Sequence, residues 1–244
     1  MKIIAHRGAS AGAPENTLAA FRLAWEENAD GVEFDIQLTA DGQIVVIHDD
    51  DTRRTTGQPG AVCSWKLRDL QRLDSGSWKG AKWRGERIPT LEEALDAIPA
   101  GKLAFIEIKC GAEILPELRR VIQNIRFNPS RVVFVGFSIE VMALAKRTFD
   151  TCLVLWNVEP QSVANAEWVR GLCRQVRQSG IGGLGLGIGR VVNVETVRII
   201  REEGQQLFVW TVDDAKTARR TKDIGVEFIA TNKPGWIRKQ IGSS

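Results

Sequence analysis

Only two histidines occur in this chain of 244 residues, and each of them ends a short apolar run. His6 follows Lys2–Ala5, and His48 follows Ile44–Ile47. An imidazole changes protonation near neutral pH, so a pair of them is suited to taking up and giving back a proton in one reaction. A lone histidine is usually structural, but two histidines that both end apolar runs point to a shared acid–base site.

Three carboxylates accompany the histidines in strand-like segments. Glu33 and Asp35 are two residues apart, and so are Glu107 and Lys109. Because alternate residues of a strand share a face, each pair is expected to point to one side. Carboxylates without thiolates or a histidine cluster favour a hard cation, Mg²⁺ or Ca²⁺, between which the sequence does not choose. Taken singly, each acid could equally be a solvated or ion-paired residue at a strand end.

Two basic residues complete a possible phosphate site. Arg7 offers a planar guanidinium that matches phosphate oxygens, although a structural pair with a carboxylate is the alternative. Lys109 could bind a phosphate oxygen or pair with Glu107. With a cation, these groups would neutralise the non-bridging oxygens of a phosphodiester, while the histidines move protons at the nucleophile and the leaving alkoxide. The predicted chemistry is phosphoryl transfer at a hard-metal site.

The elements that must position these residues alternate regularly along the chain. The expected strands are Lys2–His6, Gly31–Ile36, Leu103–Ile108, Arg131–Phe137, Cys152–Trp156, Gly180–Leu186, Gln206–Thr211 and Val226–Ala230. The expected helices are Thr17–Asn28, one capped by Thr90 and Glu93, Glu113–Arg126, Ile139–Thr148, Ala166–Gln178, Val194–Glu203, Asp214–Asp223 and Gly235–Gln240. Eight such units predict an α/β fold, a (β/α)₈ TIM barrel, whose active site lies at the carboxyl ends of the strands. The residues expected at such ends are His6, Arg7, Glu33, Asp35, Glu107, Lys109, Phe137, Trp156 and Trp210.

Residues 49–88 interrupt this alternation after the second strand. They follow a hairpin expected over Gln37–Ile47, which carries His48 at its end. The segment contains nine basic and six acidic residues, and it shows no pattern for an independent core. Its tryptophans are Trp65, Trp78 and Trp83. We therefore expect a small insertion subdomain within a single catalytic domain that spans residues 1–244.

Some residues near the expected strand ends have more than one interpretation. Asn16 is expected to cap the helix that follows it. Glu15 could orient Arg7 or His6, or could be a simple loop acid. The glycine-rich run over residues 182–189 is similar to a phosphate loop only superficially, because it lacks the terminal Lys-Ser/Thr of such loops. We interpret the run as a barrel strand.

The order of the motifs resembles the glycerophosphodiester phosphodiesterase family, in its soluble bacterial form. The matching segments are His6-Arg7-Gly8, Pro14-Glu15-Asn16-Thr17, Glu33-Phe34-Asp35, His48-Asp49 with Arg54-Thr55-Thr56-Gly57, residues 88–95, Glu107-Ile108-Lys109 and Val209-Trp210-Thr211-Val212. The resemblance implies a metal-dependent TIM barrel that hydrolyses small glycerophosphodiesters to an alcohol and glycerol 3-phosphate. The implied roles are an acid/base pair of His6 and His48, one divalent cation on Glu33, Asp35 and Glu107, phosphate binding by Arg7 and Lys109, and a pocket lined by Trp210.

Two departures from the family pattern leave substrate choice open. The family often has Thr-Asp-x-Pro near the last strand, whereas this chain has Asn232 in place of the aspartate. The chain also has no tyrosine. Trp210 could alternatively serve barrel packing alone. The head-group alcohol, and whether water or the substrate's glycerol hydroxyl attacks first, are not determined by the sequence.

Composition excludes some classes of partner. The net charge of +3, from 33 basic and 30 acidic residues, is too balanced to indicate nucleic-acid binding. We see no signal peptide and no apolar stretch near the roughly 20 residues of a membrane helix, so a cytoplasmic protein without an integral membrane segment is expected. The four cysteines are widely spaced and are expected to be reduced. Oligomeric state stays open.

Three other functions compete with this prediction. A lysophospholipase D would use the basic, tryptophan-containing insertion at a lipid interface. A non-catalytic phosphate-binding barrel is disfavoured by the presence of both histidines and all three acids. A metallohydrolase of amide bonds usually needs a histidine-rich metal site, which two histidines do not supply.

Overall fold

Eight parallel strands close into a barrel in the computed structural model, which describes residues 1–125, 127–159 and 165–242. The barrel strands are β1 (Lys2–His6), β2 (Gly31–Leu38), β4 (Leu103–Ile108), β5 (Val132–Gly136), β6 (Leu153–Val158), β7 (Gly183–Gly187), β8 (Gln206–Trp210) and β9 (Phe228–Thr231). β1 pairs with both β9 and β2, which closes the ring. The predicted (β/α)₈ fold is confirmed.

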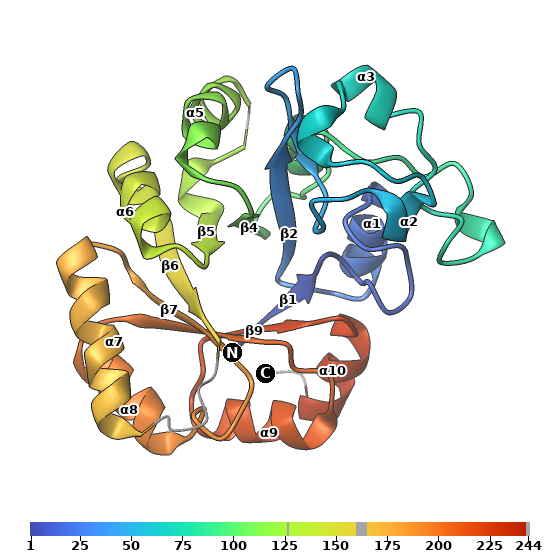
Figure 1. The fold of residues 1–244 in the computed structure, drawn as a ribbon. Helices are drawn as coiled ribbons and strands as arrows, with labels where there is room; N and C mark the ends of the chain where they lie inside the picture. Colours follow the sequence, from blue (N-terminus) through green and yellow to red (C-terminus); the bar gives the residue numbers. More distant parts are fainter. Residues whose placement is uncertain (126, 160–164, 243–244) are drawn as a thin grey trace.

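Helices surround the ring of strands on the outside (Figure 1). They are α1 (Leu18–Glu26), α4 (Leu91–Asp96), α5 (Leu115–Asn124), α6 (Ile139–Thr148), α7 (Ala166–Ser179), α8 (Val194–Glu202), α9 (Ala215–Asp223) and α10 (Pro234–Ile241). The predicted capping box of Thr90 and Glu93 starts α4. The predicted end of α5 at Arg126 lies outside the described residues. Within the described part of the chain, no helix has both the length and the apolar character needed to cross a membrane.

Several strand boundaries differ from the prediction by one to three residues: β5, β8 and β9 shift by one or two residues at their ends, and three further differences have a pairing or backbone reason. β2 extends to Leu38 because it continues as the antiparallel partner of β3 (Ile44–Val46). β6 extends to Val158, where it still pairs with β7. β7 begins at Gly183, since Gly180 adopts a left-handed conformation (φ 69°) and ends α7.

The glycine-rich run forms the buried strand β7. Atoms of the two adjacent strands occupy the space that side chains of this run would need. A Cβ atom added to Gly183 would lie 2.1 Å from the carbonyl oxygen of Gln206. One added to Gly185 would lie 2.0 Å from Oδ1 of Asn157. The run therefore allows β7 to approach its neighbours closely, which agrees with its interpretation as a barrel strand.

The insertion packs on the barrel's hairpin. It contains the short helices α2 (Arg53–Thr56) and α3 (Leu67–Leu70) and lies beside α1 and β2 (Figure 1). Short 3₁₀ segments are η1 (Val62–Ser64) and η2 (Ala81–Trp83) in the insertion, with η3 (Ala112–Ile114) and η4 (Pro129–Arg131) in the barrel. A small buried cluster joins Val62, Leu70 and Ile88 of the insertion to Val45 and Ile47 of the hairpin. This packing fixes the insertion next to His48.

Candidate active site

The cavity at the carboxyl end of the barrel follows from strand periodicity. Ile4 and Phe105 lie in the apolar barrel interior. Because alternate residues share a face, His6 and Glu107, two residues further along their strands, point into the same interior nearer its open carboxyl end. For the same reason, the interior residues Val135, Leu155 and Phe208 are followed two positions later by Phe137, Asn157 and Trp210. The cavity has a volume of about 350 Å³, and its lining includes His6, Arg7, Glu33, His48, Glu107, Lys109, Phe137, Asn157, Glu159 and Trp210.

Glu33 lines this cavity from the middle of β2, not from the strand end that the sequence predicted. Asp35, also in the middle of β2, is buried and does not line the cavity itself. His6, the last residue of β1, is aligned with Glu33, the third residue of β2. Asp35 is aligned with Glu107 on β4. The stagger between barrel strands therefore brings residues from the middle of one strand and the ends of others to the same level.

The three carboxylates form one buried cluster. Glu33, Asp35 and Glu107 each offer an oxygen, and these oxygens lie within 4.8 Å of one another. Burial, and then the charges of Asp35 and Glu107, raise the pKa of Glu33 well above its ordinary value. Burial, and then Asp35, also raise the pKa of Glu107. Repulsion among the three carboxylates therefore favours the binding of a proton or a cation, even though Arg7 and Lys109 contact the cluster.

The donor set fits one hard divalent cation. Oε1 of Glu33 is buried and has no hydrogen-bond partner among the described residues. Three converging carboxylates, with no histidine or thiolate as a ligand candidate in the cluster, are the oxygen donors that Mg²⁺ and Ca²⁺ take. The residues predicted from the sequence to hold a metal are thus the residues that lie together.

Arg7 lies in a strained turn directly after β1. Its φ of 55° is left-handed, and its backbone N–H donates to Oε2 of Glu33 at 3.0 Å. Gly8 follows with φ 81°, and a Cβ atom there would lie 2.6 Å from that of Ala20 on α1. Burial acts to lower the pKa of Arg7, but the negative charges of Asp35, Glu33 and Glu15 outweigh burial and raise that pKa. Its guanidinium is therefore held charged beside the carboxylate cluster.

Lys109 stands between the cluster and His48. Its Nζ donates to Oε1 of Glu107 at 2.9 Å and lies 3.3 Å from Nε2 of His48. Burial acts to lower the pKa of Lys109, but Glu107 and Asp35 outweigh it and raise that pKa. An ammonium group only donates, so Nε2 of His48 accepts and Nδ1 carries the ring proton here.

His48 is held by a buried side chain that the sequence did not single out. Gln37 donates from Nε2 to the carbonyl oxygens of His48 (3.0 Å) and Asp49 (2.7 Å), which fixes the turn after β3. Nδ1 of His48 lies 2.7 Å from Oδ1 of Asp49. A hydrogen bond from Arg54 is the main reason that the pKa of Asp49 falls to about 2. His48 therefore has a carboxylate partner that stays ionised.

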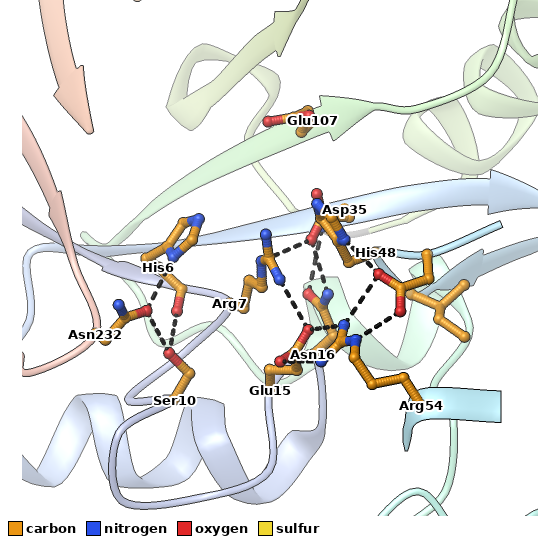
Figure 2. Close-up of polar contacts among 12 residues, drawn as sticks. His6, Arg7, Ser10, Glu15, Asn16, Asp35, His48, Arg54, Glu107 and Asn232 are labelled. Carbon is orange, nitrogen blue, oxygen red and sulfur yellow. Dashed lines mark hydrogen bonds and ion pairs between the residues drawn. The ribbon is translucent and has the colours of Figure 1, made fainter. Parts of the chain in front are cut away.

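Arg54, from the insertion, lies beside Glu15 on the His48 side of the site (Figure 2). It donates from Nε to Asp49 at 2.6 Å, and from its two terminal nitrogens to Glu15 at 2.9 and 2.8 Å. Glu15 in turn accepts from Arg7 at 2.9 Å. Of the interpretations of Glu15, orientation of Arg7 is the one the geometry matches, with Arg54 as an unpredicted second partner.

His6 lies on the opposite side and has a neutral partner. Its Nδ1 lies 2.9 Å from Oδ1 of Asn232, and its Nε2 lies 3.9 Å from Oε2 of Glu33 (Figure 2). Burial, and then the positive charge of Arg7, lower the pKa of His6. The ring is therefore held neutral at neutral pH.

Aromatic residues form part of the cavity wall. Phe137 and Trp210 pack edge to face with ring centroids 5.6 Å apart. Nε1 of Trp210 is buried and has no acceptor within the described part of the chain, so it is available to a ligand. Trp156 was expected beside them, but it points away from the cavity. Its Nε1 donates to the carbonyl oxygen of Phe137 at 2.9 Å.

Two asparagines act differently from expectation. Asn157 was missed because the predicted strand ended one residue before it; it lines the cavity and donates to Oε2 of Glu107 at 3.2 Å. Asn16 is not the helix cap, because the hydroxyl of Thr17 accepts from the backbone of Ala20. Asn16 instead adopts φ 56° and donates to Oδ2 of Asp35 at 2.8 Å.

Known proteins resemble this chain over nearly its full length. Residues 6–236 match the Glycerophosphoryl diester phosphodiesterase family. YhdW of Bacillus subtilis strain 168, which is provisionally named a glycerophosphodiester phosphodiesterase, is 36% identical to this chain. The match covers 98% of this chain and 97% of YhdW. A glycerophosphodiester phosphodiesterase of Caldanaerobacter subterraneus is 35% identical to this chain, and the match covers 95% of this chain and 94% of that protein. An Oleispira antarctica phosphodiesterase, solved with the product sn-glycerol-3-phosphate, superposes with a TM-score of 0.89 at 29% identity, over 100% of this chain and 97% of that one. The chain belongs to the glycerophosphodiester phosphodiesterase family.

Proposed function

We propose that this protein hydrolyses glycerophosphodiesters to an alcohol and sn-glycerol 3-phosphate with the help of one divalent cation and two histidines. The observation that carries the proposal is one cavity, in a chain of this family, that is lined by two histidines, two acids and two cationic side chains, namely His6, His48, Glu33, Glu107, Arg7 and Lys109. Asp35 lies buried beside the two acids. The product named for the Oleispira antarctica structure supports the same substrate class.

The charged residues divide into a cation site and a phosphate site. Glu33, Asp35 and Glu107 would hold Mg²⁺ or Ca²⁺, which when bound supplies charge stabilisation to the phosphate oxygens. Arg7 and Lys109 would bind non-bridging oxygens from their positions in the cavity lining. The free indole N–H of Trp210 gives a further donor at the wall. These donors are fixed before substrate arrives, which is how electrostatic catalysis is most effective.

The two histidines would carry the protons. Nε2 of His6, on a neutral ring near Glu33, would take the proton from the attacking hydroxyl. Nε2 of His48 faces Lys109 inside the cavity; after it has taken up a proton from solvent, the doubly protonated ring would give that proton to the leaving alcohol oxygen. Asp49 would offset the charge of the His48 ring while it carries that proton.

A panel of glycerophosphodiesters, assayed with and without EDTA, tests the proposed function. We expect release of glycerol 3-phosphate from glycerophosphocholine, loss of activity in EDTA and recovery on adding Mg²⁺ or Ca²⁺. Preference for lysophosphatidylcholine would indicate the lysophospholipase D alternative. Full turnover after exhaustive chelation, or release of phosphocholine in place of glycerol 3-phosphate, would contradict the proposal.

A further inference from the structure

A chain of polar side chains continues behind His6, away from the cavity. Asn232, directly after β9, places Oδ1 2.9 Å from Nδ1 of His6. On its other side, the Asn232 amide nitrogen Nδ2 donates to Oδ2 of Asp213, in the loop after β8. Three segments that are far apart in the sequence thus meet at one imidazole.

Asp213 determines which way the Asn232 amide faces. Its Oδ1 accepts from the hydroxyl of Thr231 at 2.9 Å and from the backbone N–H of Asn232 at 2.8 Å. An ionised carboxylate can only accept hydrogen bonds. The amide NH₂ of Asn232 must therefore face Asp213, and the amide oxygen must face His6.

The orientation of the amide in turn determines the tautomer of His6. An amide oxygen cannot donate, so the proton of the neutral ring lies on Nδ1 and the lone pair lies on Nε2. Nε2 is the ring nitrogen that lies near Glu33. The Ser10 hydroxyl has a single proton, which it donates either to the Asn232 oxygen at 2.7 Å or to the carbonyl oxygen of His6 at 2.8 Å, so Asp213 is the group that orients the amide.

We propose that Asn232 and Asp213 are positioning residues that hold His6 as its Nδ1–H tautomer, with Nε2 free to accept a proton in the cavity. The effect of Asn232 and Asp213 on turnover rests on the proposed function of His6. The tautomer of His6 does not depend on that proposed function. Neither residue lines the cavity, so both would act through the imidazole and not on the substrate.

Nitrogen-15 NMR of the histidine rings tests the tautomer directly. The chain has only two histidines, so the labelled protein with Mg²⁺ gives two ring systems, and His48→Gln identifies the signals of His6. At a pH where the rings are neutral, we expect a pyrrole-type Nδ1 and a pyridine-type Nε2 for His6. A pyridine-type Nδ1 for His6 in the wild-type protein would overturn the proposal.

A charge-exchange pair of variants tests the role of Asp213. Asp213→Asn removes the carboxylate that orients the amide, so the Asn232 NH₂ can turn toward His6 and favour the Nε2–H tautomer. We expect kcat to fall about 10- to 100-fold, as for other residues that orient a functional group from outside, with KM little changed. The double variant Asn232→Asp/Asp213→Asn restores an acceptor for His6 and a donor behind it, and should recover both the spectrum and most of kcat.

Asp214→Asn is the matched control in the same loop. Asp214 caps α9 by accepting from the backbone of Thr217, and no contact joins it to His6 among the described residues. This variant should keep the His6 tautomer and kcat. If Asp213→Asn retains the Nδ1–H signal and full kcat, or if the double variant rescues neither, the proposed positioning role is wrong. A wild-type protein with the expected spectrum and no phosphodiesterase activity would refute the proposed function alone.

Discussion

The two histidines stand in contrasting regions of the same cavity. His6 ends a barrel strand, its side chain is 19% exposed, and its Nδ1 faces the neutral amide of Asn232. His48 follows the hairpin, its side chain is 30% exposed, and its Nδ1 faces the carboxylate of Asp49. The His6 side is built from barrel strands, whereas the His48 side depends on Arg54 of the insertion.

The contrast suggests how one cavity supplies a base and an acid. A general base must be neutral before it acts, and burial with Arg7 nearby keeps His6 in that form. A general acid carries an extra positive charge, for which Asp49 is a fitting partner. Different environments for chemically identical groups are a common way to separate acid and base roles.

Removing the carboxylate of Glu33 should have the largest effect, because the proposed cation site serves the chemistry of both histidines. For Glu33→Gln, we expect activity to fall about a thousand-fold, since charge stabilisation of several kcal/mol corresponds to two to three powers of ten. Isothermal titration with Mg²⁺ should show weaker binding. Glu117→Gln, at a half-buried position on α5 outside the cavity lining, is the control. Wild-type activity and Mg²⁺ affinity in Glu33→Gln would remove Glu33 from the cation site.

The same variant should stabilise the metal-free protein. The pKa of Glu33 is raised in the fold, so the metal-free protein loses stability as pH rises from the ordinary glutamate pKa toward that raised value. A neutral glutamine avoids this loss. Thermal unfolding at pH 7 should therefore show a higher Tm for Glu33→Gln in EDTA and a smaller Tm gain on adding Mg²⁺. A lower Tm in EDTA would contradict the account of the cluster.

Disturbing the insertion should have an intermediate effect. Arg54→Gln removes the cation that joins Asp49 to Glu15, so His48 and Arg7 both lose orientation. We expect kcat/KM to fall about 10- to 100-fold, the range for residues that orient functional groups. Arg53→Gln, the neighbouring exposed position in α2, is the matched control. Equal kinetics for the two variants would show that the insertion does not position the site.

The smallest effect concerns stability at acid pH. The pKa of Asp49 is lowered to about 2 in the fold, mainly by Arg54, so this pair stabilises the protein above the ordinary aspartate pKa and ceases to do so as pH falls through about 2. The difference in unfolding free energy between wild type and Arg54→Gln should shrink over that window. Because the groups are partly exposed, we expect a difference below about 1 kcal/mol at neutral pH. A difference that grows with acidification would contradict this sign.

On both sides of this comparison, the sequence predicted the residues that line the cavity better than the residues that hold them in place. His6 and Glu107 could be predicted because their strands are short and apolar, and the site residue ends each pattern. Asn232 lies 226 residues from His6, and no local pattern indicates that pairing. Gln37 and Arg54 act on the His48 segment through side-chain contacts, with the backbone after β3 and with Asp49, that no local pattern indicates.

Barrel geometry explains two further differences. Glu33 and Asp35 share a face, as the spacing predicts, but their level in the barrel depends on strand stagger, which periodicity does not encode. Asn157 was missed because a polar residue at the end of an apolar run looks like the end of the strand. In the structure, pairing with β7 carries the strand past it.

Substrates with different leaving groups would test the division of labour between the two histidines most directly. His6→Ala and His48→Ala would each be assayed on glycerophosphocholine and on a glycerophosphodiester with a nitrophenol leaving group. On the alkyl substrate, we expect each variant to lose about 10²- to 10⁴-fold in kcat. On the nitrophenyl substrate, which needs little protonation, His48→Ala should recover much of its activity and His6→Ala should not. Equal losses of both variants on both substrates would contradict the assignment of His6 as base and His48 as acid.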